Sequence, residues 1–312
     1  LFHIDNLEES GILPANVVYS LSDLYGESFE EFKAGWRYIE SQKRLRAIQT
    51  LAELCETNYD LGYELLAYLG FEDEMPEIRA ASVDLVWFDA SEKLFHRLMA
   101  LAEDHSPIVR AAAISGLGRF IYEAEVAHFN GQLAEMARDF VVERYYDYLE
   151  DVQVRRSALE AASQGSHPAV PDMILEAYQS PEHEMRVSAL FAMGASCDTE
   201  RWRDIVMQEL DSQYPDMRFQ AARAAGELVL EEAVIKLFEL ANEPDYEIKT
   251  QAIISLGDIG SNEAKRSLNA LAERATQEGD NDLLEVIEEA IEYSSFMGGL
   301  LLPMFDFDED NE

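Results

Sequence analysis

The chain has 312 residues, 48% of them hydrophobic, so it can bury a sizeable core and is not a disordered chain. It carries 62 Asp and Glu against 24 Lys and Arg, a formal net charge of −38. That balance argues against nucleic-acid backbones and anionic membrane surfaces, which need clustered Lys and Arg, and it suits either a basic protein partner or solubility alone.

The cysteines and the apolar runs exclude further classes of protein. Cys55 and Cys197 are far apart and form no C-x-x-C motif, so neither a disulfide framework nor a zinc site is expected. The longest apolar stretch, near residues 296–305, is about half the length of a transmembrane helix. We expect a cytoplasmic protein.

The N-terminal segment, residues 1–40, lacks the repeat described below. Residues 28–41 read as an amphipathic helix with Phe32 and Trp36 on its apolar face. Ser28 followed by Glu31 matches a capping box, and we expect the helix to begin near Ser28. We expect this helix to cap one end of the fold.

A nine-residue phrase recurs from residue 41 to residue 293 and predicts about seven helix pairs. Each copy opens on a basic residue, the anchor, and four of the six steps between anchors are 31 or 32 residues. Self-similarity at this period is typical of a solenoid. The anchors are Arg44, Arg79, Arg110, Arg155, Arg186, Arg218 and Lys249.

The phrase has the periodicity of a helix. Positions +3, +4 and +7 from the anchor are small or aliphatic and share one helix face. Position +8 is glycine in four copies, which predicts a left-handed helix end there. Pro76, Pro107 and Pro215 precede their anchors by three residues and fit a first helical turn. We interpret the anchor as structural, paired with an acid of the adjacent turn to form a ladder along the stack.

The longest step, 45 residues, separates Arg110 from Arg155 and includes the insertion 121–151. Aromatic residues crowd its end. Either a longer helix buries them in the core, or the insertion presents them to a partner, as insertions in solenoids often do. Tyr145, Tyr146 and Tyr148 are therefore candidate partner-binding residues.

The C-terminal region has no Lys or Arg after residue 274. Residues 280–294 predict a last helix that caps the stack, and residues 294–312 form an acidic tail. The apolar run 300–305 either tucks against the last repeat or offers a linear motif. On the second reading the candidate contacts are Phe305, Phe307 and Asp308.

No motif predicts catalysis, a cofactor or a metal. The phosphate-binding loops and the zinc spacings of histidine are missing from the sequence, and residues 305–312 lack the turn glycine of a calcium loop. One His-Glu pair, His183-Glu184, stands at the start of a repeat. The HEAT-type iron enzyme deoxyhypusine hydroxylase uses several such pairs, so its iron site is not expected here.

The phrase P-x-[IVM]-R-x-x-A…G at about 31 residues resembles the HEAT-like repeats named after phycobilisome lyases. The resemblance covers roughly residues 41–293 and implies an all-α fold, a right-handed α-solenoid. The ends of the chain resemble those of uncharacterised bacterial HEAT-repeat proteins.

The main functional hypothesis is a non-catalytic protein–protein interaction scaffold or adaptor with an acidic surface for a basic partner. One alternative is a bilin-lyase-like subunit that acts on a pigment apoprotein, and another is a structural subunit of a larger complex. The sequence leaves open the partner, the face that binds it and the oligomeric state.

Overall fold

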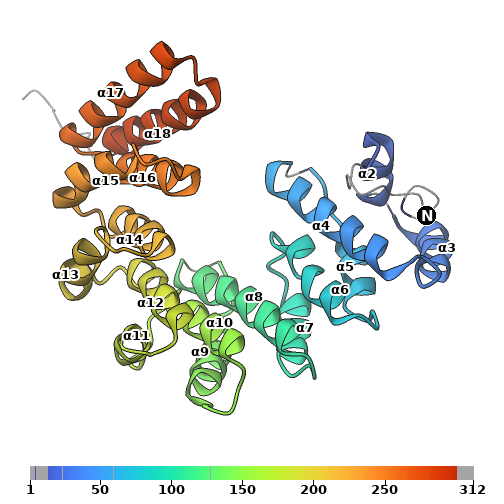
Figure 1. Cartoon of the computed structure of the whole chain (residues 1–312). Helices are drawn as coiled ribbons and strands as arrows, with labels where there is room; N and C mark the ends of the chain where they lie inside the picture. Colours follow the sequence, from blue (N-terminus) through green and yellow to red (C-terminus); the bar gives the residue numbers. More distant parts are fainter. Residues whose placement is uncertain (1–3, 5–12, 23, 59, 127, 301–312) are drawn as a thin grey trace, which may run out of the picture. The chain divides into compact units, whose positions relative to one another are not determined.

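The structure of the chain, a computed structural model, describes residues 4, 13–22, 24–58, 60–126 and 128–300, with the backbone alone for 56, 57 and 296–300. In this part of the chain every regular element is a helix (Figure 1), which confirms the all-α prediction. By its internal contacts the chain divides into two compact units, Leu1–Val170 and Pro171–Glu312.

Unit 1 is a stack of helix pairs. Four of its helices contain an anchor, and we call these and their equivalents anchor helices. Each packs on the next one along the chain. They are α4 (Ser41–Thr57), α6 (Pro76–Ala81, continued by the 3-10 turn η1, Asp84–Val86), α8 (Pro107–Glu125) and α10 (Val152–Ala162). The other helices are α2 (Ala15–Ser22), α3 (Gly26–Trp36), α5 (Glu64–Gly70), α7 (Glu92–Leu101) and α9 (Gly131–Tyr146).

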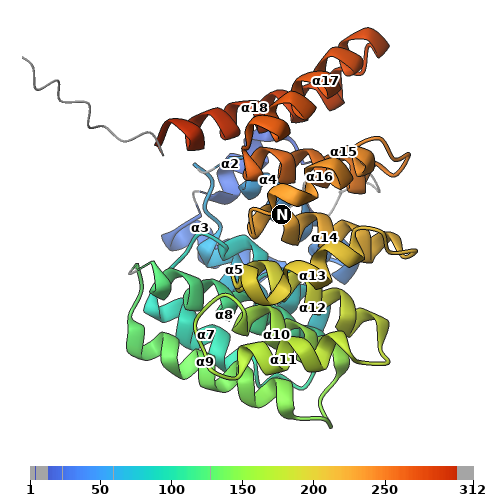
Figure 2. The same ribbon diagram turned by 90° about the vertical axis from the view of Figure 1, so that its left-hand side faces the viewer.

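Unit 2 repeats this plan. Its anchor helices follow one another in both views (Figures 1 and 2), and α13, α15 and α17 pack beside them. The anchor helices are α12 (His183–Ala195), α14 (Pro215–Glu227), α16 (Tyr246–Ile259) and α18 (Asn281–Leu300). The other elements are α11 (Val170–Tyr178, which begins at the last residue of unit 1), α13 (Thr199–Glu209), η2 (Glu231–Ala233), α15 (Val234–Leu240) and α17 (Asn262–Glu278).

The small or aliphatic residues of the repeated phrase form the core. The residue at +3 is wholly buried in all seven copies, from Ala47 to Ala252. Pro76, Pro107 and Pro215 are each the first residue of a helix, as predicted. The stack of helix pairs is thus the α-solenoid arrangement that the repeat predicts. No helix among the described residues is both long and apolar enough to cross a membrane.

The glycines at +8 do not end the helices, which corrects that prediction. Gly194 and Gly226 lie inside α12 and α14, against the next anchor helix. A Cβ atom on Gly226 would lie 2.9 Å from the Cα of Ser255 in α16. The left-handed residue comes three positions later, at Cys197, Val229 and Gly260.

The predicted capping box at Ser28 does not form, although a helix does begin near this residue. Helix α3 begins at Gly26, and its N-cap residue Tyr25 makes no side-chain capping bond. The Ser28 hydroxyl instead donates to the Tyr25 carbonyl oxygen at 2.7 Å. Trp36 and Phe32 are buried, so the predicted apolar face is present.

The extra length of the insertion 121–151 forms helix rather than a new element. Helix α8 continues to Glu125 and α9 occupies Gly131–Tyr146, so both helices are longer than most of their equivalents. At the other end, α18 continues to Leu300, beyond the predicted helix end at residue 294.

Helix α18 occupies the place of an eighth anchor helix. Ala290 packs against Gly257 of α16, as Ser255 of α16 packs against Gly226 of α14. In this register Leu284 replaces the basic anchor. The aliphatic +4 residue becomes Glu288 and the glycine at +8 becomes Glu292, and both are exposed. A further anchor helix would have to bury these carboxylates, so α18 suits the end of the row.

Candidate interaction surface

The anchor arginines bridge consecutive repeats through carboxylates. Each accepting carboxylate lies in the turn that precedes the next anchor helix, and we call each such ion pair a rung. Rungs are seen at Arg44, Arg79, Arg110 and Arg218. The rungs are Arg44–Asp73 at 2.9 Å, Arg79–Asp104 at 2.8 Å, Arg110–Glu150 at 2.5 Å and Arg218–Glu243 at 2.9 Å. The predicted ladder is confirmed at these positions.

The same arginines also bind their own turn. Arg79 Nη1 donates to the Asp73 carbonyl oxygen and Arg110 Nη1 to that of Asp104, both at 2.8 Å. Asp73 and Asp104 thus accept from one arginine with the carboxylate and from the next with the carbonyl. These charge-assisted bonds fix each helix relative to the one after it.

Two rungs shift the pKa of their carboxylates. Burial disfavours the charged form of Asp104, but hydrogen bonds from Arg79 and from the Ser106 backbone outweigh it, so the pKa of Asp104 is lowered. Burial likewise disfavours the charged form of Glu150. Hydrogen bonds from Arg110 and from the Asp151 backbone outweigh burial, so the pKa of Glu150 is also lowered. Both carboxylates therefore stabilise the stack in their charged form.

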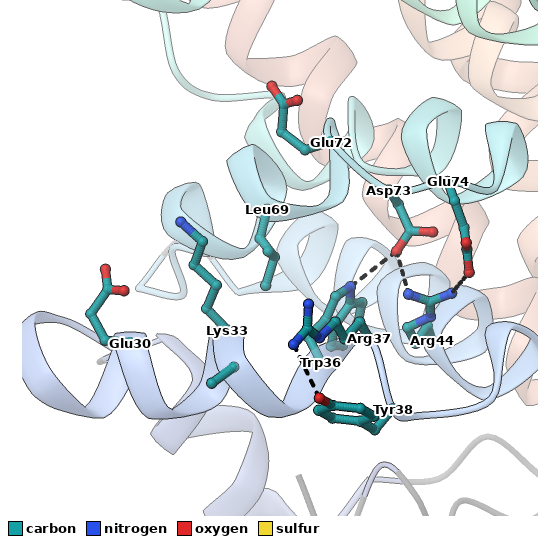
Figure 3. Close-up of a pocket in the computed structure, with 11 residues that line it drawn as sticks. Glu30, Lys33, Trp36, Arg37, Tyr38, Arg44, Leu69, Glu72, Asp73 and Glu74 are labelled. Atoms are coloured by element: carbon teal, nitrogen blue, oxygen red, sulfur yellow. Dashed lines mark hydrogen bonds and ion pairs between the residues drawn. The ribbon is translucent and has the colours of Figure 1, made fainter.

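A pocket of about 670 Å³ lies at the first rung, between α3, α4 and the end of α5. Figure 3 shows Asp73 between Trp36 and Arg44. Trp36 Nε1 donates to Asp73 Oδ2 at 3.1 Å, and the Arg44 and Asp73 side chains are only 4% and 1% exposed. Glu30, Lys33 and Arg37 line the pocket from the side of α3, and Glu72 lines it from the other side. The deep polar groups thus serve the rung, and the lining of mixed charge favours no single ligand.

In the turn after α9 the anchor Arg155 contacts aromatic rings. The Arg155 guanidinium lies 5.3 Å from the centre of the Tyr145 ring and 4.8 Å from that of Tyr148. Its Nε donates to the Tyr145 carbonyl oxygen at 2.9 Å. Tyr145 and Tyr146 meet edge to face at 5.1 Å. Arg155 thus contacts Tyr145 and Tyr148, and Tyr145 contacts Tyr146.

The candidate partner-binding tyrosines differ in their exposure to solvent. Tyr145 is fully buried, which corrects its expected place from a partner-binding surface to the core, because a buried ring offers no contact area. Tyr146 is 37% and Tyr148 64% exposed, so both lie at the surface. Phe305, Phe307 and Asp308 lie outside the described residues.

The sequence reasoning missed Leu149, which is 98% exposed beside Tyr148. The Leu149 backbone N–H donates to Asp147 Oδ1 at 3.1 Å, and that of Glu150 donates to the Asp147 carbonyl oxygen at 3.0 Å, so the turn is well defined. An apolar residue between Tyr148 and the acids 150 and 151 was the available signal. Tyr146, Tyr148 and Leu149 together are called the tyrosine turn below.

His183, singled out in the sequence, lies in a polar contact between α12 and α14. Its Nε2 is 2.6 Å from Asp216 Oδ2, and its Nδ1 faces Arg186 Nη2 at 3.1 Å. Because a guanidinium can only donate, Nδ1 accepts and Nε2 carries the proton. Among the described residues no group of three or more His, Cys, Asp and Glu side chains is arranged to hold a metal ion.

Solved structures similar to this chain are helical-repeat proteins. Escherichia coli YibA is 18% identical, with a TM-score of 0.46, over 90% of this chain and 96% of that one. Importin beta is 13% identical, with a TM-score of 0.46, and the 91% of this chain that aligns spans 43% of importin beta. Human deoxyhypusine hydroxylase is 16% identical, with a TM-score of 0.37, over 86% and 96% of the two chains. No curated protein sequence matches.

A family model of HEAT repeats matches residues 203–292. This segment contains anchor helices α14 and α16 and the rung Arg218–Glu243. The phycobilisome-lyase type of the repeat stays a prediction. Residues 203–292 thus match HEAT repeats, and the anchor helices outside this segment follow the same helical plan.

Proposed function

We propose that the chain is a non-catalytic scaffold that binds another protein, with the tyrosine turn as one contact. The observation that supports this best is the exposure of Tyr148 and Leu149 on a turn whose backbone and rings are held in place. Apolar side chains that a rigid turn holds in water cost little entropy to bury against a partner. Tyrosine is enriched in interface cores for this reason.

The surrounding charge supports a basic partner. Asp147 and Asp151 flank Tyr148 and Leu149 and are exposed, while Glu150 is held by Arg110. The whole chain carries a formal charge of −38. A partner with clustered Lys and Arg would be attracted at long range and then oriented by these carboxylates.

Binding rather than catalysis is proposed because the polar clusters of the described residues are engaged in the fold. The His183–Asp216 contact has the form of an acid–base pair, yet Arg186 occupies the second ring nitrogen, where a nucleophile would have to donate. The rung carboxylates are held by arginines.

The test is quantitative affinity capture from the native host with three full-length baits. They are the wild type, Tyr148→Ala/Leu149→Ala, and the control Tyr25→Ala/Ile235→Ala, which removes similar exposed apolar area elsewhere, since Tyr25 is 74% and Ile235 63% exposed. We expect one protein to be captured in near-stoichiometric amount by the wild type and the control, and at least about tenfold less by the tyrosine-turn variant. Equal capture by all three baits contradicts the site, and the lack of any stoichiometric protein contradicts the function.

A further inference from the structure

The second anchor helix of unit 1 cannot pack closely at position +8 as the glycine-containing anchor helices do. Its regular part, α6, ends at Ala81, and the 3-10 turn η1 follows. The +8 position holds Trp87, where four other anchor helices have glycine. At Gly118 in the same unit a Cβ atom alone would come within 3.0 Å of the Cα of the next anchor helix at Ala161. An indole ring does not fit such a contact.

The two aromatic rings at this break turn towards water instead. Trp87 is 45% and Phe88 58% exposed. The other two tryptophans, Trp36 and Trp202, are 3% and 2% exposed. Trp87 and Phe88, called the aromatic step here, therefore present a large apolar area that the fold does not cover.

Arg119 of α8 holds the aromatic step in position. Its Nη1 donates to the Val86 carbonyl oxygen at 3.3 Å and its Nη2 donates to that of Asp89. The guanidinium lies 5.8 Å from the Trp87 ring centre and 4.8 Å from that of Phe120. Burial lowers the pKa of Arg119. A half-buried cation that bonds backbone carbonyls on both sides of Trp87 and Phe88 keeps these rings preorganised.

Two carboxylates lie near Arg119, the arginine that holds the aromatic step. Asp89 and Glu123 are close enough to Arg119 to oppose the effect of burial on its pKa. Glu123 Oε2 lies 3.4 Å from His128 Nδ1, and Asp89 Oδ1 accepts from the Ser91 backbone N–H at 2.8 Å. Aromatic faces attract cations through their quadrupole, and neighbouring carboxylates add to that attraction. The local chemistry is thus complementary to Arg or Lys.

We propose that Trp87 and Phe88 form a docking surface for a basic segment of a protein partner. An arginine or lysine of that segment stacks on the Trp87 ring, with Asp89 and Glu123 facing its charge. The inference rests on the proposed function in that the partner is a protein. It concerns a surface distinct from the tyrosine turn, and a peptide probe tests it without the native partner.

The probe is an end-blocked hexa-arginine peptide, and its neutral control is the matching hexa-citrulline peptide. We expect hexa-arginine to bind the full chain saturably in calorimetry, to shift the tryptophan emission and to protect it from acrylamide quenching. Since Trp87 is the exposed tryptophan of the three, these signals report on the aromatic step. We expect the citrulline peptide, which lacks the charge, to leave all three readouts unchanged.

The variant Trp87→Ala/Phe88→Ala should bind hexa-arginine about fivefold or more weakly. The control Tyr25→Ala, which keeps the net charge, should bind like the wild type. Trp87→Phe keeps a ring and should retain most of the affinity while losing the fluorescence change. Unchanged affinity in the double variant, or equal binding of hexa-citrulline, overturns the proposal. If the double variant does not fold, unprotected emission in the wild type overturns it. These outcomes are independent of capture by the tyrosine turn, so each proposal can fail alone.

Discussion

At the scale of single residues, the charges of this molecule have two opposite roles. Rung carboxylates such as Asp104 are stabilised in the charged form by an arginine of the preceding repeat. Asp258 is in the reverse situation. Burial, and after it the nearby Glu227, raise the pKa of Asp258. Ionisation of a rung carboxylate such as Asp104 therefore stabilises the folded chain, whereas ionisation of Asp258 destabilises it.

Removing a rung should destabilise the chain and change how its stability depends on pH. In Arg79→Ala the carboxylate of Asp104, 15% exposed, loses its partner, and we expect a loss of about 1–3 kcal/mol at pH 7. Because the pKa of Asp104 is lowered in the fold, this stabilisation is present above its unfolded value near 3.8 and disappears as the pH falls below it. Urea unfolding at several pH values measures the difference.

The control for the rung is Arg274→Ala, which removes only exposed contacts, namely the pair Arg274–Glu278 within α17 and a hydrogen bond to Asn242 Oδ1. Such pairs contribute about 0.3–0.5 kcal/mol, so this variant should unfold close to the wild type. An Arg79→Ala variant no less stable than Arg274→Ala at pH 7 would contradict the role of the rungs.

Asp258→Asn should have the opposite effect. The raised pKa of Asp258 means that its ionisation costs stability, and the cost grows as the pH rises from the unfolded value towards the folded one. We expect the variant to be more stable than the wild type at pH 7 by about 0.5–2 kcal/mol, with the gain vanishing in acid. Glu285→Gln, at an exposed site of α18, should change stability little. A gain that is the same at pH 4 and pH 7 would refute the explanation.

At the scale of helices, packing between the anchor helices of unit 2 depends on glycine at +8 and on a left-handed residue at +11. Gly226 lets α16 approach α14. Val229 ends that segment with φ at +53°, a conformation that β-branched residues avoid. Gly260 has the same place after α16 with φ at +59°.

Gly226→Ala should lower stability by about 1–3 kcal/mol, because the new methyl group meets the Cα and Cβ of Ser255 at 2.9 Å. Gly131→Ala is the matched control. It lies in α9 with nothing within 4 Å of the added atom, so the better helix propensity of alanine should raise stability by up to about 1 kcal/mol. Thermal unfolding of both variants should give shifts of opposite sign. Equal shifts would show that close helix approach does not explain the glycines.

Val229→Gly should stabilise the chain. A left-handed conformation costs an ordinary residue about 1–2 kcal/mol, and glycine gives back part of this through its unfolded-state entropy. We expect a net gain of about 0.5–1 kcal/mol in chemical unfolding. The reciprocal change Gly260→Val should destabilise. A loss of stability in Val229→Gly would mean that the valine side chain, 54% exposed, contributes more than the backbone conformation costs.

The sequence predicted those elements that depend on local periodicity and not those that depend on contacts between repeats. The anchor helices and their buried +3 residues follow from spacing alone. The left-handed residues did not, because Cys197 and Val229 carry no sign of a positive φ. The role of glycine at +8 requires the next helix. Tyr145 and Tyr148 look alike in the sequence, and only the folded structure shows that the first ring lies in the core and the second at the surface.

At the scale of the whole molecule, net charge decides what kind of partner can approach. The excess of acids is present in both units, and α18 presents Glu285, Glu288, Glu289 and Glu292 to solvent. Such a field accelerates encounter with a basic protein and does little for a neutral one. The apolar contacts of the tyrosine turn would then hold the partner.

The central claim, that this acidic scaffold binds a basic protein, is tested most directly by capture of partners from the native host at two salt concentrations. The Debye length falls from about 10 Å at 0.1 M salt to about 3 Å at 1 M. The account predicts a near-stoichiometric protein of basic surface charge at 0.1 M that is largely released at 1 M. Capture of a protein without a basic surface, or retention unchanged at 1 M, would contradict it.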